Sequence, residues 1–309
     1  MAAGISNEKL MEMETVKIAI AMASHIRYKG QVAKLRGAVD SLLKQRKTSD
    51  VLLSISFAND AYKREFHEMQ RKHPKIKMFV SEKHKFQMEH LHALSKHFKE
   101  YSLILFCDDD DMYHPLRTFR FADAYLAEMS RLQKGEKLVG VKEMKWCRHT
   151  HTGCSTPIAS EFWCYGVIPS VIETFFARIK DDFDLLKHPF ADIIFREYFR
   201  RIDPKNRWAT IQTAPLYQYQ HHANSVTQRT KNEAMRDPKI GVRHEMFSGA
   251  IAPCTDARCC LSKSARVRRL AQHTPYQTVE QLENIFPEEE YVKVVMQFLC
   301  DIPFECPGN

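Results

Sequence analysis

The stretch that decides the fold reads LILFCDDDD and covers residues 103–111. Five apolar residues in a row predict a buried strand, and four aspartates, Asp108 to Asp111, follow directly behind it. Like charges about 4 Å apart repel by roughly 4 kcal/mol at an effective dielectric near 20, so such a cluster needs a positive partner. The pattern therefore predicts a binding site at the end of the strand. The alternative is a solvated acidic loop.

If the extended backbone continues, alternate side chains share a face. Asp108 and Asp110 would then point one way, and Asp109 and Asp111 the other. Carboxylate oxygens prefer a hard cation, Mg²⁺ or Mn²⁺, over zinc. We therefore expect Asp108 and Asp110 to share one such ion.

The bulk composition is that of an ordinary soluble globular protein. The chain has 309 residues, 44% hydrophobic and 27% charged, enough for one large or two moderate domains. The formal net charge of +8 fits an anionic ligand but is too dispersed to predict nucleic-acid binding. No apolar run is long enough to predict a transmembrane helix. Nine cysteines without a recognisable secretion signal predict reduced thiols and a cytoplasmic protein.

Strand-like and helix-like segments alternate behind residues 1–14, which we expect to be polar, frayed and flexible. Strands are predicted at residues 16–23, 51–57, 76–80 and 103–107, and a helical pattern follows each of them. Such βα units predict an α/β fold with a mostly parallel central sheet flanked by helices. Ligands of these sheets bind beyond the carboxyl ends of the strands, where the aspartates lie.

The alternation weakens after about residue 140. Further strands are predicted at residues 139–146, 162–168 and 209–219, and helices after Pro169 and Pro189. The region beyond about residue 231 is basic and contains cysteines, and a helix is predicted near its end, at residues 289–299.

The aspartate segment FCDDDDMYHP, residues 106–115, resembles the Asp-x-Asp block of nucleotide-sugar glycosyltransferases with the Rossmann-like GT-A fold, particularly glycosyltransferase family 2. Three further segments resemble the family in the same order. They are SHIR at residues 24–27, ND at residues 59–60 and YQYQHHANSVT at residues 217–227. The resemblance covers roughly residues 15–230.

The chain departs from this family at two places. Gln220 stands where the family usually has arginine, and residues 86–91 lack an Arg-Asn pair on the helix before the acidic strand. His84, Lys85 and His90 are candidates to replace that pair.

The resemblance implies one GT-A domain in two halves, a nucleotide-sugar-binding half at residues 15–140 and an acceptor-binding, catalytic half at residues 141–230. A C-terminal accessory region with a helical extension would occupy residues 231–309. This region is a candidate cover for the acceptor site and a candidate docking surface for a partner or a membrane. The implied donor is a UDP or GDP sugar, the acceptor a glycan, lipid-linked or protein hydroxyl, and the cofactor Mn²⁺ or Mg²⁺.

The resemblance also implies roles for single residues. Asp108 and Asp110 would ligate the metal, with His222 as a third candidate ligand. The residues expected to contact the nucleotide sugar are Ser24, Arg27, Asp60, Asp108, Asp109 and Asp111. Among these, Asp60 would read the base or cap the next helix, Asp111 would support the site or face the sugar, and Asp109 is more simply a surface charge.

Asp192 is similar to the family's catalytic aspartate at the start of a helix, which implies an inverting reaction with Asp192 as general base. An aspartate in a first helical turn also interacts with the helix dipole. Glu161 and Glu197 are the rival bases. Trp163 and Tyr165 are candidates for a sugar-binding platform, although aromatic residues in a strand are more often core.

Two groups of cysteine and histidine invite a zinc prediction. Cys147, His149, His151 and Cys154 lie within eight positions, and Cys254, Cys259 and Cys260 lie close together further along. Neither group has the spacing of a zinc motif, so we predict no zinc site in either.

Two other functional classes remain open. A haloacid-dehalogenase-like phosphatase also uses strand-Asp-x-Asp, but with Thr or Val two positions after the second aspartate, where this chain has Met112. A non-catalytic protein with the GT-A fold would bind or act as a scaffold. Manganese together with UDP or GDP should stabilise a transferase and leave a scaffold unchanged.

Overall fold

The computed structural model describes residues 7–71, 76–150, 153–156, 161–180, 186–187, 191–201, 206–212 and 215–220. The chain divides into two compact units, a first unit of residues 1–192 and 205–220 and a second of residues 193–204 and 221–309. The helix predicted at residues 289–299 and the accessory region 231–309 lie outside the described residues. The predicted halves, residues 15–140 and 141–230, remain predictions.

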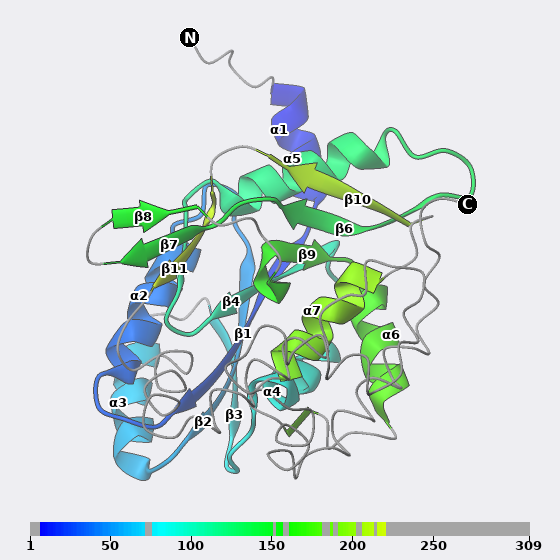
Figure 1. The fold of residues 1–309 in the computed structure, drawn as a ribbon. Helices are drawn as coiled ribbons and strands as arrows, with labels where there is room; N and C mark the ends of the chain where they lie inside the picture. The colour runs from blue at the N-terminus through cyan, green and yellow to red at the C-terminus, as the bar shows by residue number, and fades with distance from the viewer. Residues whose placement is uncertain are drawn as a thin grey trace, which may run out of the picture. The chain divides into compact units, whose positions relative to one another are not determined.

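A seven-stranded sheet forms the centre of the first unit, in the order β10-β6-β9-β4-β1-β2-β3 (Figure 1). β9 runs antiparallel to β4 and β6, and every other neighbouring pair is parallel. The predicted α/β class with a mostly parallel sheet is therefore confirmed. The strands are β1 (Ile18–Ile26), β2 (Asp50–Phe57), β3 (Ile76–Ser81), β4 (Leu103–Asp108), β6 (Lys137–Glu143), β9 (Tyr165–Val167) and β10 (Asn206–Ile211).

Helices flank this sheet. Figure 1 shows α2 and α3 on one side of it and α4 and α6 on the other. α4 packs against β1 and β2, and α5 packs against β6 and β10. The helices of the chain's described part are α1 (Asn7–Thr15), α2 (Gln31–Leu43), α3 (Asp60–Gln70), α4 (Gln87–Ser95), α5 (Arg117–Met129), α6 (Pro169–Ile179) and α7 (Ala191–Arg201), with a 3₁₀ turn, η1 (Phe162–Cys164).

The central strands are apolar along both faces because helices cover both sides of the sheet. β4 buries all five of its apolar residues, and β1 is buried along nearly its whole length. Burying a side chain such as Ile20 or Leu105 stabilises the fold by about 1.5–3 kcal/mol. Gly166 in β9 lets α5 approach closely, since a Cβ atom there would lie 2.7 Å from the Phe121 ring.

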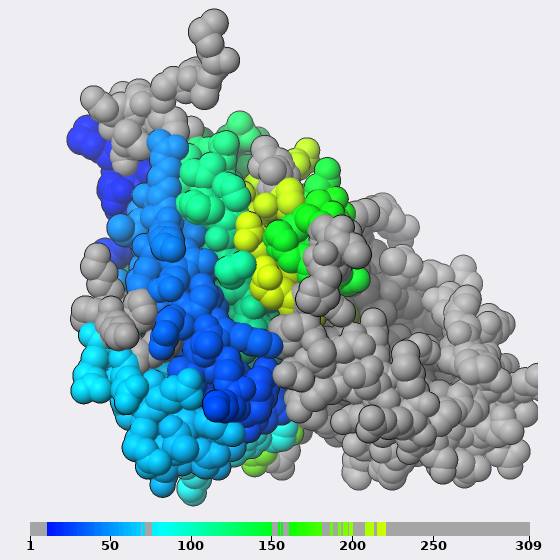
Figure 2. All heavy atoms as spheres, turned by 90° about the vertical axis from the view of Figure 1, so that its left-hand side faces the viewer, coloured from blue at the N-terminus to red at the C-terminus, as the bar shows by residue number. Residues whose placement is uncertain are grey.

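A second, four-stranded sheet has the order β5-β11-β7-β8. Its strands are β5 (Met112–Tyr113), β7 (Cys147–Thr150), β8 (Gly153–Ser155) and β11 (Tyr217–Gln220). β11 lies between β5 and β7, and in Figure 2 yellow atoms of residues 206–220 lie between the teal and green atoms of earlier segments. This sheet brings residues 217–220 next to the chain that follows the aspartates.

Three predicted elements differ from the structure. Residues 209–219 form two strands in two sheets, β10 and β11, because the chain leaves the first sheet after Ile211. Residues 162–168 begin with η1 before β9. Of the segment 1–14 that we expected to be frayed, residues 7–14 lie in α1, whose Met13 is buried.

Candidate active site

The four aspartates do not continue the strand. β4 ends at Asp108, and the Asp111 backbone N–H donates to the Asp108 carbonyl oxygen at 3.3 Å, which closes a turn. The predicted alternation of faces is therefore wrong, since it requires an extended backbone through Asp111. The turn sends the side chains towards different elements.

Asp109 faces the end of β1 and the start of α2. Its Oδ2 accepts hydrogen bonds from Ser24 Oγ at 2.5 Å and Gln31 Nε2 at 3.1 Å. Gln31 is itself oriented, since its Oε1 accepts from the Arg27 backbone N–H at 3.0 Å. The prediction that Asp109 is a surface charge is thus wrong. Ser24 is buried and its hydroxyl holds Asp109.

Burial raises the pKa of Asp109 to about 6, and the charge of Asp110 adds to the increase. The hydrogen bonds from Ser24 and Gln31 and the charge of Arg27 oppose this increase in the Asp109 pKa. Arg27 is exposed at the end of β1, where the sequence predicts a nucleotide contact.

Asp108 faces α4. Its Oδ1 accepts a hydrogen bond from Gln87 Nε2 at 2.7 Å, and its backbone N–H donates to the Tyr217 hydroxyl oxygen at 3.1 Å. Within the described residues, Oδ1 is the only Asp108 side-chain oxygen that accepts a hydrogen bond. Burial raises the pKa of Asp108 well above its usual value, and further increases come from the charges of Asp111, Asp110, Asp109 and Asp192.

Asp111 is fully buried and faces β11. Oδ2 accepts from the Tyr217 hydroxyl and Oδ1 from the Gln220 backbone N–H, both at 2.7 Å. Burial and then the Asp110 charge raise the pKa of Asp111 well above its usual value, although these two hydrogen bonds lower it. Both side-chain oxygens of Asp111 therefore accept hydrogen bonds from β11.

Asp110 lies in the turn and is half-buried. Its charge raises the pKa of each of the other three aspartates. Burial and then the repulsion between neighbouring carboxylates disfavour the anionic forms, and a bound cation would offset that cost. The donors are all hard oxygens, so the site fits Mg²⁺ or Mn²⁺. His222, the third candidate ligand, lies outside the described residues.

Asp192 lies in the first turn of α7 and belongs to the first unit. It is half-buried, and its charge contributes to the raised pKa of Asp108, which places it in the electrostatic range of the acidic turn. Of the rival bases, Glu161 precedes η1 and is half-buried, whereas the Glu197 side chain lies outside what the structure describes.

Asp60 is exposed at the start of α3. The helix is capped by Asn59, whose Oδ1 accepts from the Tyr62 backbone N–H at 3.1 Å. The predicted capping role of Asp60 is therefore wrong, because its neighbour fills the position. The contact between Asp60 and a base stays a prediction.

His90 cannot replace the family's missing Arg-Asn pair, because it is buried between β2 and α4. One ring nitrogen hydrogen-bonds Ser54 Oγ at 2.8 Å and the other Ser56 Oγ at 3.0 Å. Burial, followed by the charge of Lys85, lowers the pKa of His90 to about 3. His84 is exposed, and its ring lies edge-on to the His25 ring at 4.2 Å.

Trp163 and Tyr165 are both buried, so neither forms an open sugar platform. The Trp163 ring stacks on the Tyr217 ring at 4.1 Å, and the Tyr165 ring packs edge-on against Trp208 at 5.0 Å. The expectation that such aromatics are core holds for both.

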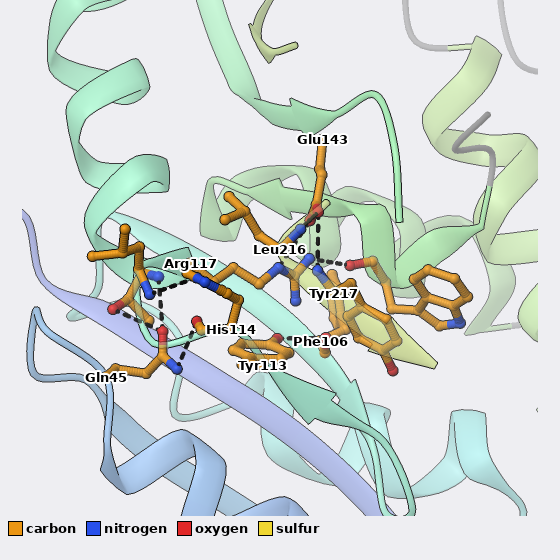
Figure 3. Close-up of polar contacts among 11 residues, drawn as sticks. Gln45, Phe106, Tyr113, His114, Arg117, Glu143, Leu216 and Tyr217 are labelled. Carbon is orange, nitrogen blue, oxygen red and sulfur yellow. Dashed lines mark hydrogen bonds and ion pairs between the residues drawn. The ribbon is translucent and has the colours of Figure 1, made fainter. Parts of the chain in front are cut away.

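A buried ion pair between α5 and β6 holds the start of β11 (Figure 3). Arg117 Nε lies 3.0 Å from Glu143 Oε2, and Arg117 also donates to the Trp163 carbonyl oxygen at 2.6 Å. Glu143 Oε1 accepts the backbone N–H groups of Leu216 and Tyr217. The pair therefore fixes the strand that delivers the Tyr217 hydroxyl to Asp111.

The sequence did not reveal these supporting residues. Gln87 lies in the stretch where the family's Arg-Asn pair is missing. A polar side chain in that first helical turn could have indicated a contact with the aspartates. Gln31, Arg117 and Glu143 have no local signal, since their partners are distant in the sequence.

The cysteines divide into two kinds in the described part of the chain. Cys107 and Cys164 are free and buried, as predicted for reduced thiols. Cys147 and Cys154 form a disulfide, contrary to that prediction. His149 lies beside them, whereas His151, Cys254, Cys259 and Cys260 lie outside the described residues.

Among the described helices, none is long and apolar enough to cross a membrane.

No protein-family model matches the chain, and no curated protein matches its sequence. Among solved structures it is similar to S. aureus TarS. The TarS 1–349 complex with UDP-GlcNAc is 13% identical with a TM-score of 0.45, and the match covers 93% of this chain and 90% of that one. Against the longer TarS structure, at the same identity and TM-score, 91% of this chain spans about half (53%) of that one.

The chain is also similar to the mannosyltransferase PcManGT from Pyrobaculum calidifontis in complex with GDP-Man and Mn²⁺. That structure is 10% identical with a TM-score of 0.43, and the match covers 93% of this chain and 86% of that one.

Proposed function

We propose that the chain is a metal-dependent glycosyltransferase that moves a sugar from a UDP or GDP sugar to an acceptor hydroxyl, with inversion. The acidic turn at the carboxyl end of β4 carries this proposal. Four carboxylates lie together there, and Asp108, Asp109 and Asp111 have raised pKa values. Hydrogen bonds hold these three side chains, with Gln87, Ser24 and Tyr217 among the donors. A fold keeps such a costly cluster where a cation and an anionic ligand bind.

Asp108 and Asp110 are the residues that would hold Mn²⁺ or Mg²⁺, with His222 as a further candidate. Asp111 has both oxygens engaged, which leaves it as a support of the turn, whereas Asp109 faces the end of β1 and the start of α2 and is a candidate contact of the nucleotide sugar. A divalent ion at this position supplies Lewis-acid stabilisation of the charge that develops on a departing diphosphate.

The donor nucleotide would lie along the carboxyl ends of β1 and β2, where ligands of parallel sheets bind. Arg27 is exposed there and carries the positive charge that a diphosphate requires. Asp60 is exposed at the end of the next strand, where its carboxylate can accept hydrogen bonds from a base. Ser24 positions Asp109 and is buried, so its contribution to the nucleotide is indirect.

Asp192 would accept the proton of the acceptor hydroxyl as that oxygen bonds to the anomeric carbon. An aspartate is a weak base, but the hydroxyl becomes more acidic as the new bond forms. The electrostatic influence of Asp192 on Asp108 supports a position beside the donor site.

A screen of nucleotide sugars for Mn²⁺-dependent transfer and hydrolysis tests the proposal. We expect turnover with a UDP or GDP sugar, and Asp192→Asn should lower transfer by about 10²–10⁴-fold while nucleotide binding is retained. Glu161→Gln is the matched control. If Glu161→Gln abolishes transfer and Asp192→Asn does not, Glu161 is the base. Hydrolysis of a generic phosphomonoester would favour the phosphatase alternative, and a chain that Mn²⁺ with UDP or GDP does not stabilise would favour a scaffold.

A further inference from the structure

The hairpin of β7 and β8 gathers three metal-ligating side chains away from the aspartates. His149 pairs directly with Cys154 across the two strands. Cys147 lies two residues before His149 on the same strand, so all three side chains project from one face of the hairpin. The hairpin pairing brings together residues whose sequence spacing resembles no zinc motif.

The ligand atoms of these residues lie within 4.8 Å of one another. Cys147 Sγ is 3.3 Å from His149 Nε2. Zinc bonds of about 2.3 Å to sulfur and 2.0–2.1 Å to nitrogen, at a tetrahedral angle, separate such ligand atoms by about 3.6 Å. Cys147 is buried, His149 half-buried and Cys154 exposed, so solvent reaches the cluster from one side.

We propose that the β7–β8 hairpin is a redox-gated zinc site, in which Cys147, His149 and Cys154 bind Zn²⁺ once the disulfide between the two cysteines is reduced. A dithiol reductant supplies two electrons and two protons, the S–S bond breaks, two thiols form, and the reductant becomes a disulfide. Zinc then displaces both thiol protons to solvent, and neutral His149 offers Nε2. The fourth position of the tetrahedron belongs to water.

The donor set selects the metal. Two thiolates and an imidazole are soft and borderline ligands that suit Zn²⁺, whereas Mn²⁺ and Mg²⁺ prefer the carboxylates of the acidic turn. The two sites would therefore hold different metals in the same chain.

The hairpin also borders the strand that supports the acidic turn. In the register of β11 with β7, Gln218 pairs with Cys147 and Gln220 with His149. The Gln220 backbone N–H is a donor to Asp111. Zinc in the hairpin would cross-link β7 to β8 beside this strand.

The zinc content of the protein tests the proposal and requires no sugar donor or acceptor substrate. The full chain is reduced with a phosphine under anaerobic conditions, incubated with Zn²⁺ and desalted, and bound zinc is quantified by atomic emission. We expect Cys147→Ser/Cys154→Ser to retain one equivalent less than the unaltered chain, and His149→Ala to bind that equivalent at least tenfold more weakly. Cys254→Ser/Cys259→Ser/Cys260→Ser, the matched control, should keep the hairpin equivalent.

Cobalt provides a readout that does not depend on the variants folding. Co²⁺ added to the reduced unaltered chain should give a thiolate-to-metal charge-transfer band, and oxidation of the Cys147 and Cys154 thiols to the disulfide should abolish it. Two results would overturn the proposal: zinc retention that is equal in the unaltered chain and the Cys147/Cys154 variant, and a cobalt spectrum that lacks thiolate ligation.

Discussion

Gln87 illustrates how one side chain prepares the acidic turn. Its side-chain amide donates a hydrogen bond to Asp108 Oδ1 at 2.7 Å. This contact fixes the orientation of the carboxylate, and with it the direction of Oδ2. Removal of a partner that orients a metal ligand typically costs 10–100-fold in affinity. We therefore expect Gln87→Ala to weaken Mn²⁺ binding about 10–100-fold, as measured by calorimetric titration.

Gln70→Ala is the control for this variant, because Gln70 contacts His67 on α3 and none of the aspartates. Equal Mn²⁺ affinities for Gln87→Ala and Gln70→Ala would show that Asp108 needs no such support.

Tyr217 is the second single residue on which the turn depends. Its hydroxyl donates to Asp111 and accepts from the Asp108 backbone N–H. Tyr217→Phe leaves two buried polar groups without this partner, which should lower the free energy of unfolding by about 1–3 kcal/mol. Urea denaturation measures the change, and Tyr125→Phe, at a half-buried position on α5, should cost under about 0.5 kcal/mol. A Tyr217→Phe variant as stable as the control would contradict this role.

The sequence indicates that the aspartates form a site but not what each one does. The run of four is visible because an apolar strand precedes it. The roles of Asp109 and Asp111 depend on the turn at Asp108 and on partners far away in sequence, such as Ser24 and Tyr217. Local pattern carries no information on contacts between residues separated by 85 or 106 positions.

At the scale of elements, Arg117 and Glu143 join α5, β6 and the start of β11. The Arg117 side chain is fully buried, and its guanidinium lies 4.1 Å from the centre of the Tyr113 ring. Glu143 satisfies two backbone N–H groups in addition to the arginine. The ion pair thus sets how the strand after the aspartates meets β11.

Arg117→Met should lower the free energy of unfolding by about 3–5 kcal/mol, because it leaves the buried Glu143 carboxylate without its cation. Arg117→Met/Glu143→Leu should not recover this loss, since the Leu216 and Tyr217 N–H groups then lack an acceptor. Chemical denaturation of both variants decides the point. Full recovery in the double variant would mean that Glu143 serves only to neutralise Arg117.

Elements with strong periodic patterns were predictable. The four βα units appear where apolar runs followed by helical patterns indicate them, because burial dictates those patterns directly. The division of residues 209–219 between β10 and β11 was missed, although Pro215 lies between the two strands and proline interrupts strand pairing. The second sheet escaped prediction because its strands are short and pair across long separations.

At the scale of the whole molecule, buried histidine makes stability depend on pH. The pKa of His90 is lowered to about 3 by burial and the Lys85 charge, whereas an unfolded histidine has a pKa of about 6.5. The unfolded chain therefore binds a proton at this residue below about pH 6.5 and the folded chain does not. The contribution of neutral, buried His90 to the free energy of unfolding is therefore complete above about pH 6.5. It is lost as the pH falls towards 3, because protonation then favours the unfolded chain.

We expect His90→Asn to remove this dependence. Below about pH 6, the unaltered chain should lose free energy of unfolding relative to His90→Asn as the pH falls. The difference should change by up to about 1.4 kcal/mol per pH unit. Urea denaturation between pH 4.5 and about 7.5 measures this difference, because the range spans the unfolded-state pKa of histidine. The exposed His67→Asn variant is the control, and parallel pH profiles for the unaltered chain and His90→Asn would contradict the prediction.

The central claim is that the carboxylates at the end of β4 bind a divalent ion together with a nucleoside diphosphate. Calorimetric titration of Mn²⁺ in the presence of UDP or GDP tests it most directly, with the unaltered chain, Asp110→Asn and the control Glu100→Gln, an exposed acid before the other end of β4. We predict that Asp110→Asn weakens binding at least tenfold and that Glu100→Gln leaves it unchanged. Equal Mn²⁺ affinity in all three proteins would contradict the claim.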